Sequence, residues 1–122
     1  MTDRELLEMA AKAAGIVLTW GSKYMVGDDE VDCTDIPYVT SESPDVTPYC
    51  WNPLEDDGDA LRLAVKMGMS VNIFPNDDAR TECASHLQNN FVDEAWRHHT
   101  DPYTATSRAI VRCAAEIGKA MK

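Results

Sequence analysis

The sequence predicts an α/β (α+β) fold, a sandwich in which three helices cover a mainly antiparallel sheet. Amphipathic patterns with helical spacing stand at the beginning, in the middle and at the end of the 122-residue chain. The segments between them are β-branched or alternate apolar with polar residues, as strands do. This order suits helices packed on a sheet, and the length predicts a single domain over residues 1–122.

The first helix is predicted over residues 3–14. Thr2 and Glu5 match a capping box, in which each side chain bonds the backbone N–H of the other residue. Apolar residues then recur with helical spacing, so one face of this helix is expected to lie on the core. Gly15 stands where a left-handed C-terminal cap is expected.

Two short strands and a long acidic loop are predicted next. Residues 16–20 are β-branched and aromatic, and residues 23–26 follow a Gly-Ser turn as a second, short strand. Residues 27–52 contain three prolines and show no sustained periodicity of either kind. Loops of this length are uncommon within a compact domain and are often functional.

The middle helix has two predicted starts. Asn52 can act as its N-cap with Pro53 at the first helical position, or the helix begins at Asp56 or Asp57 after a turn. In both interpretations Gly68 ends the helix, because glycine favours the left-handed conformation there.

The segment after the middle helix predicts a strand and then a hairpin. Residues 69–74 alternate apolar and polar side chains and stop at a proline, which indicates a half-buried strand. Residues 80–87 and 91–97 are interpreted as two strands around a turn at 88–90, where Asn-Asn suits positive φ. A helix over 79–87 is the alternative.

The last helix begins at Pro102, with Asp101 as its cap. One regular apolar face follows over about five turns, at steps of three and four residues. That face is formed by Tyr103, Ser107, Ile110, Ala114, Ile117 and Met121.

The net charge of −10 is unevenly distributed along the chain. Eleven acids and no Lys or Arg fall between residues 27 and 59, whereas residues 102–122 contain four basic residues and one acid. Because such a molecule repels phosphate backbones, we expect no direct binding to duplex nucleic acid. An acidic surface favours a partner with a basic surface.

Cysteine usage and hydropathy predict the compartment. The four cysteines are not preceded by a signal-peptide pattern, so free thiols in a cytoplasmic protein are expected. No apolar run approaches the roughly 20 residues of a membrane span, so no membrane association is expected.

Three segments, residues 3–15, 52–66 and 101–112, resemble the phage ABA-sandwich domain family of small phage and prophage proteins. The likeness covers the chain in outline, but residues 27–50 and 76–98 are variable and no property of the family can be transferred to them. It implies a phage-encoded protein with a three-layer α-β-α sandwich, located in the cytoplasm of the bacterial host. It implies no activity, and no catalytic residue can be transferred.

Two groups of residues are candidates for binding. In the first, acids of the long loop and of the middle-helix start would contact a basic partner. In the second, a cationic and aromatic group precedes the last helix, where a phosphate or carboxylate can bind. The first group comprises Asp28, Asp29, Glu30, Asp32, Asp35, Asp56, Asp57 and Asp59 with Trp51, and the second Arg97, His98 and His99 beside Trp96 and Tyr103.

Two weaker patterns concern metals. Carboxylates at residues 55–59 could hold Mg²⁺ or Ca²⁺, but they lack EF-hand spacing and acids at a helix start have a structural reason. Cys83 and His86 form a single pair with zinc-like spacing, followed by His98 and His99, and on a strand the pair would point to opposite faces. No metal site, cofactor or catalytic residue is therefore predicted.

These observations favour a small acidic phage accessory protein that acts as a non-enzymatic binding module and inhibits a host defence component with a basic surface. The alternative is a binder or sponge for signalling nucleotides, which needs Arg97, His98, Arg80 or Arg108 in one pocket. A metal-dependent hydrolase built on the acidic cluster ranks third. The last helix or a sheet edge could also form a homodimer.

Overall fold

The chain folds into a mixed α+β structure with three helices and three small antiparallel sheets among its described residues. The computed structural model describes residues 2–21, 23–32, 36–39, 49–76, 78–85 and 90–121. Its elements are α1 (Asp3–Ala14), β1 (Leu18–Trp20), β2 (Lys23–Val26), β3 (Asp29–Asp32), β4 (Pro37–Val39), β5 (Tyr49–Cys50), α2 (Asp57–Lys66), β6 (Met69–Phe74), β7 (Arg80–Ser85), β8 (Asn90–Ala95), the 3-10 turn η1 (Trp96–His98) and α3 (Pro102–Ala120).

The caps place the helices as the sequence predicts. The Thr2 hydroxyl accepts from the backbone N–H of Glu5 at 3.1 Å, and Gly15 closes α1 with φ 70°. The middle helix takes the later of its two predicted starts, because the Asp56 carboxylate caps it by accepting from the backbone N–H of Asp59 at 2.9 Å. Gly68 follows α2 with φ 61°, as expected.

The last helix confirms its predicted start and most of its predicted face. Asp101 accepts from the backbone N–H of Thr104 at 2.7 Å, and this bond lowers the pKa of Asp101. The middle of the apolar face is buried, but Tyr103 and Met121 at its ends are exposed. Buried members of the predicted face are Ser107, Ile110, Ala114 and Ile117.

The largest sheet has the order β6-β7-β8, all antiparallel. The strand over residues 69–74 is confirmed, and the hairpin at 80–97 is confirmed over its helical alternative. The second strand ends at Ala95, earlier than predicted, because residues 96–98 turn into η1. The predicted turn residues 88 and 89 lie outside the described residues.

The long loop predicted over residues 27–52 is wrong in part, because it contains β3, β4 and β5. Strands of two to four residues are too short to show a periodicity, and β3 is three-quarters acidic. The predicted strand at 23–26 exists as β2, but it pairs with β3. The preceding strand, β1, pairs instead with β4, which in turn pairs with β5.

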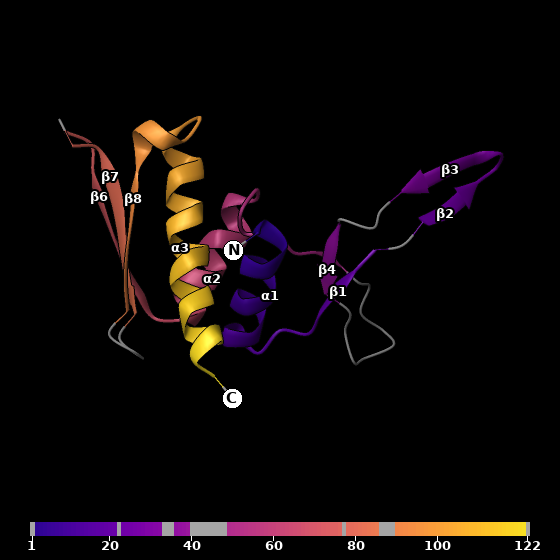
Figure 1. Ribbon diagram of the computed structural model, residues 1–122, viewed down its shortest axis with the longest axis horizontal. Helices are drawn as coiled ribbons and strands as arrows, with labels where there is room; N and C mark the ends of the chain where they lie inside the picture. Colours follow the sequence, from indigo (N-terminus) through magenta and orange to yellow (C-terminus); the bar gives the residue numbers. More distant parts are fainter. Residues whose placement is uncertain are drawn as a thin grey trace.

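The helices lie between two of the sheets (Figure 1). One face of β6-β7-β8 packs on α3, and α1 and α2 pack on the other side of α3, with the β1-β4-β5 sheet beyond α1. Thr81, Cys83 and Ser85 of β7 are buried on the α3 side. The described helices therefore cover one face of this sheet, and the predicted three-layer α-β-α arrangement is not confirmed.

The closest approach in the core joins α1 to α3. A Cβ atom added to Gly118 would lie 1.9 Å from the backbone oxygen of Met9, so only glycine fits there without movement. Alanines from both helices fill the same interface. Among the described residues, no helix has the length and apolar character needed to cross a bilayer.

Three described cysteines are free thiols, in agreement with the expectation from the sequence. Cys50 is exposed, whereas Cys83 and Cys113 are buried between β7 and α3. Burial raises the pKa of Cys83 to about 12, and the neighbouring Cys113 adds to the effect. Cys33 lies outside the described residues.

Candidate functional site

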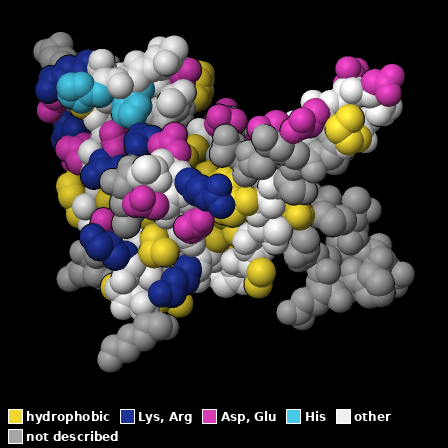
Figure 2. All heavy atoms as spheres, turned by 45° about the vertical axis from the view of Figure 1, so that its right-hand side comes forward, with side chains coloured by type: hydrophobic (Ala, Val, Ile, Leu, Met, Phe, Trp, Pro, Cys, Tyr) yellow, Lys and Arg dark blue, Asp and Glu magenta, His cyan; other side chains and the backbone are white. Residues whose placement is uncertain are grey.

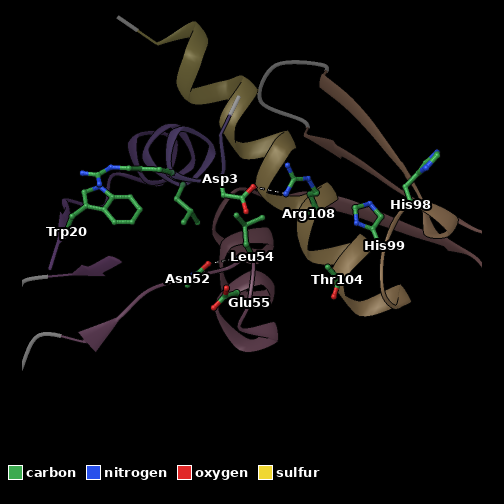
Figure 3. A pocket seen from close by; sticks show the side chains of 11 residues that line it. Asp3, Trp20, Asn52, Leu54, Glu55, His98, His99, Thr104 and Arg108 are labelled. Carbon is green, nitrogen blue, oxygen red and sulfur yellow. Dashed lines mark hydrogen bonds and ion pairs between the residues drawn. The ribbon is translucent and has the colours of Figure 1, made fainter. Parts of the chain in front are cut away.

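A pocket of about 660 Å³ opens where the N-terminal ends of α1 and α3 meet (Figure 3). Its volume lies within the range of small-molecule sites. Five separate segments of the chain contribute side chains to this pocket. The lining side chains include Asp3 and Arg4 of α1, Trp20 of β1, Asn52, Leu54 and Glu55 of the turn before α2, His98 and His99 around η1, and Thr104 and Arg108 of α3.

Caps and turns hold these segments in place. The turn before α2 is fixed because the Asn52 side chain accepts from the backbone N–H of Leu54 at 3.1 Å. The backbone N–H of Asn52 in turn donates to the Asp59 carboxylate at 3.0 Å. On the other side, the Asp101 cap fixes the start of α3, and Arg108 extends from its second turn.

The arginines of the pocket already have partners. Arg108 Nη1 lies 2.9 Å from the Asp3 carboxylate, which joins α3 to α1. Arg4 lies over the Trp20 ring, 4.3 Å from its centroid, and its Nε is 3.4 Å from the Glu8 carboxylate. An anionic ligand would therefore have to displace Asp3 or Glu8 from these guanidinium groups.

A partly buried cluster of Glu94, His99 and Arg112 lies behind the histidine side of the pocket. Glu94 is 9 % exposed, and its carboxylate contacts both Arg112 Nη1 and, at 2.9 Å, His99 Nε2. Burial by itself would raise the pKa of Glu94, but the hydrogen bonds from His99 and Arg112 outweigh it and hold the pKa below its ordinary value. The cluster fixes the His99 ring at the pocket wall.

The structure brings some of the predicted ligand-binding residues together. His98 and His99 line the pocket with Arg108, as the small-ligand alternative requires. Arg97 is exposed and is not among the lining residues. Arg80 points away on the outer face of the β6-β7-β8 sheet, where it covers the Phe74 ring and bonds Glu82 at 3.1 Å.

The predicted acidic partner site divides into two places. Asp28, Asp29, Glu30 and Asp32 are exposed on the β2–β3 hairpin, an arm that projects from the body of the molecule (Figures 1 and 2). Figure 2 shows magenta acidic side chains at the outer end of this arm. Asp35 lies outside the described residues.

The second group of acids belongs to the start of α2. Asp56 caps the helix, and Asp59 binds the backbone of Asn52 and lies 3.4 Å from Arg62, while Asp57 is exposed. Trp51, the predicted aromatic contact beside them, is 4 % exposed and belongs to the core. Helix capping therefore accounts for Asp56, and the hydrogen bond from the Asn52 backbone accounts for Asp59.

Neither predicted metal pattern forms a site in the described part of the chain. No group of three or more His, Cys, Asp or Glu side chains gathers there in a way that could hold a metal ion. Cys83 is buried between β7 and α3, and His86 lies outside the described residues.

Sequence reasoning missed most of the pocket. Asp3, Arg4, Trp20, Glu55 and Thr104 are far apart in the chain, and no spacing rule connects them. A helix-start motif marks Asp3 and Thr104, but it indicates capping and gives no hint that two helix starts meet.

Comparison with known proteins adds no relative: no family model, curated protein or solved structure matches the chain.

Proposed function

We propose that this chain is a non-enzymatic binding module that uses its β2–β3 hairpin to hold a partner protein with a basic surface. The observation that carries the proposal is the projection of this two-stranded arm from the packed body (Figure 1). An isolated two-stranded hairpin is marginally stable at best in water. A partner surface would supply the burial that the body does not.

The arm carries both apolar and acidic contact groups. Met25 and Val26 at the end of β2 are 61 % and 56 % exposed. They face Glu30 and Asp29 across the hairpin, with Asp28 in the turn. The two side chains lie on opposite faces of the hairpin, so each face presents an apolar group beside acids, and protein interfaces combine apolar and charged groups in this way. The acids would guide the arm onto a basic surface and make the association rate depend on salt.

The resemblance to phage ABA-sandwich proteins supports a more specific version of this proposal. In it, the chain is a phage-encoded accessory protein in the bacterial cytoplasm, and its partner is a host defence component whose basic surface binds nucleic acid. The acidic arm would compete with nucleic acid for that surface. The three-layer α-β-α arrangement belongs to the same proposal, with the outer face of β6-β7-β8 covered in an assembly.

Affinity capture from host lysate tests the arm. The immobilised chain is compared with Asp29→Lys and with Glu116→Lys, an equal charge change on the exposed side of α3. We expect one set of proteins to be held by the wild type and by Glu116→Lys, and to be lost with Asp29→Lys and at high salt. Identical capture by all three chains would contradict the proposal.

A second candidate function, binding of a small signalling nucleotide, is favoured by the pocket at the α1 and α3 starts. His98, His99, Thr104 and Arg108 surround a space large enough for a nucleotide. The ligand phosphate would replace Asp3 as the partner of Arg108. Phosphate–guanidinium pairs are strong, charge-assisted contacts, which makes such an exchange reasonable.

A thermal-shift panel of cyclic and ADP-ribose-type nucleotides separates the two functions. A nucleotide that binds the pocket raises the melting temperature of the wild type, and the rise disappears in Arg108→Gln. The Asp29→Lys variant keeps the same rise, because the hairpin is not involved. An unchanged melting temperature across the whole panel rejects the nucleotide function.

A further inference from the structure

The two edges of the β6-β7-β8 sheet differ in how they are protected. Both β6 and β8 end the sheet, since the order of the described strands places β7 between them. The β8 edge contains Asp93 and Glu94, and Arg112 Nη1 lies 3.5 Å from the backbone oxygen of Asp93. Charges of this kind prevent one strand edge from pairing with another.

Among the described residues, β6 itself carries no charge at its edge. No charged residue occurs from Met67 to Asn76, and β6 itself has neither proline nor lysine. The exposed fraction is greatest in its second half, where Ile73 is 56 % exposed. An uncharged, exposed strand edge of this length is a template for pairing with another strand.

An apolar groove of about 300 Å³ runs beside this edge, between α2, β6 and the start of α3. Of the described residues that line it, one is charged, Asp57. Leu61 and Tyr103 are 64 % and 71 % exposed at its sides. The edge and the groove adjoin each other, because Val71 and Ile73 of β6 also line the groove.

We propose that a second copy of this chain occupies this edge and groove, with β6 of each copy pairing antiparallel across a two-fold axis. A two-fold interface uses the same patch on both copies, so β6 meets β6 and the three-stranded sheets join into one. Ile73 and Leu61 of each copy would then face the other copy's groove. This dimer does not depend on the hairpin function.

Of the surfaces of this chain, the β6 edge is the one where charge opposes a second copy least. Two molecules with a net charge of −10 repel each other over most of their surfaces. At the β6 edge no like charges oppose each other, because residues 67–76 contain none. The hairpin arms, with Asp28, Asp29 and Glu30, would repel one another and are poor places for self-association.

Light scattering after size-exclusion chromatography tests the dimer on the full chain. We expect the wild type to have twice the mass of a single chain, and Ile73→Lys to have the single mass with an unchanged far-UV circular dichroism spectrum. Val17→Lys is the matched control, since Val17 is also exposed but lies between α1 and β1, and it should keep the doubled mass.

Hydrogen exchange on the wild type gives a second measurement that needs no variant. Backbone amides of β6 should exchange more slowly as the protein concentration rises, whereas amides of the β2–β3 hairpin should not change. A single-chain mass of the wild type at every concentration overturns the proposal. A doubled mass that persists in Ile73→Lys also overturns it, because the interface must then lie elsewhere.

Discussion

Where α1 crosses α3, the backbones approach so closely that a Cβ on Gly118 would lie 1.9 Å from the Met9 oxygen. At the β2–β3 hairpin, Met25 and Val26 are instead more than half exposed, and their strands pair only with each other among the described strands. The same chain thus contains a helix crossing that tolerates almost no added volume and an arm with almost no packing.

This difference separates stability from recognition. Substitutions in the body act through cavities, clashes and unpaired polar groups, which cost the most free energy in folded proteins. Substitutions in the arm remove contacts that the free chain does not use, so they should leave unfolding unchanged and alter binding. Substitutions in both regions can be compared on one scale, the free energy of unfolding.

The largest effect is expected for Gly118→Ala. The added methyl group must push α1 away from α3, and overpacking of this kind costs about 3 kcal/mol. Urea unfolding followed by circular dichroism measures the loss, with Lys119→Ala on the exposed side of the same turn as the control. Equal midpoints for Gly118→Ala and the wild type would show that the two helices do not meet in this way.

The next effect concerns the ion cluster of Glu94, His99 and Arg112. Arg112→Met leaves the buried Glu94 carboxylate with His99 alone, and loss of a charged partner costs about 2 kcal/mol at neutral pH. Glu116→Gln, an exposed acid on the same helix, is the control. If Arg112→Met and Glu116→Gln lower the urea midpoint by the same amount, the cluster does not stabilise the fold as proposed.

The same cluster predicts a pH dependence. The folded state lowers the pKa of Glu94, so its stabilising contribution is fully present above the unfolded carboxyl pKa of about 4.3 and is lost as the pH falls through the folded pKa. Glu94→Gln should therefore flatten the decrease in unfolding free energy below about pH 5. A slope identical to that of the wild type would show that Glu94 does not titrate with folding.

A smaller effect is expected for Thr81→Val. The Thr81 hydroxyl accepts from the Trp96 indole N–H at 3.0 Å and lies 2.7 Å from the Thr106 hydroxyl. Valine keeps the shape but leaves the indole without its partner, which costs about 1 kcal/mol. Thr100→Val, at an exposed loop position, should be neutral. If both variants unfold at the same urea concentration, the bond contributes nothing.

Helix ends and strands that depend on neighbouring residues could be predicted from the sequence. Thr2, Asp101 and Gly68 act within one helical turn, and all three ended or began a helix at the predicted residue. Alternation over residues 69–74 likewise predicted the strand that forms β6. The earlier start proposed for α2 failed because Asp56 is the residue whose side chain reaches the free N–H of the first turn.

What depends on distant parts of the chain could not be predicted. The pairing of Leu18 with Val39 joins strands that are far apart in sequence, and β4 has too few residues to show a pattern. The pocket is also non-local, since its Asp3–Arg108 ion pair joins the two ends of the chain. His98 and His99 were predicted as ligand contacts because their cationic and aromatic neighbours are adjacent in sequence.

The smallest change in stability is expected at the arm, for the double variant Met25→Ser, Val26→Ser. Both side chains are exposed in the free molecule, so the unfolding free energy should change by less than about 0.5 kcal/mol. The same variant should lose the partner captured by the wild type, because the apolar contacts of the arm are gone. Val17→Ser, an exposed apolar residue outside the arm, keeps both stability and binding. A large drop in stability would mean that the hairpin packs on the body. Retained capture would mean that the arm is not part of the interface. The stability and the binding of this one variant therefore decide whether the two regions are as separate as their packing indicates.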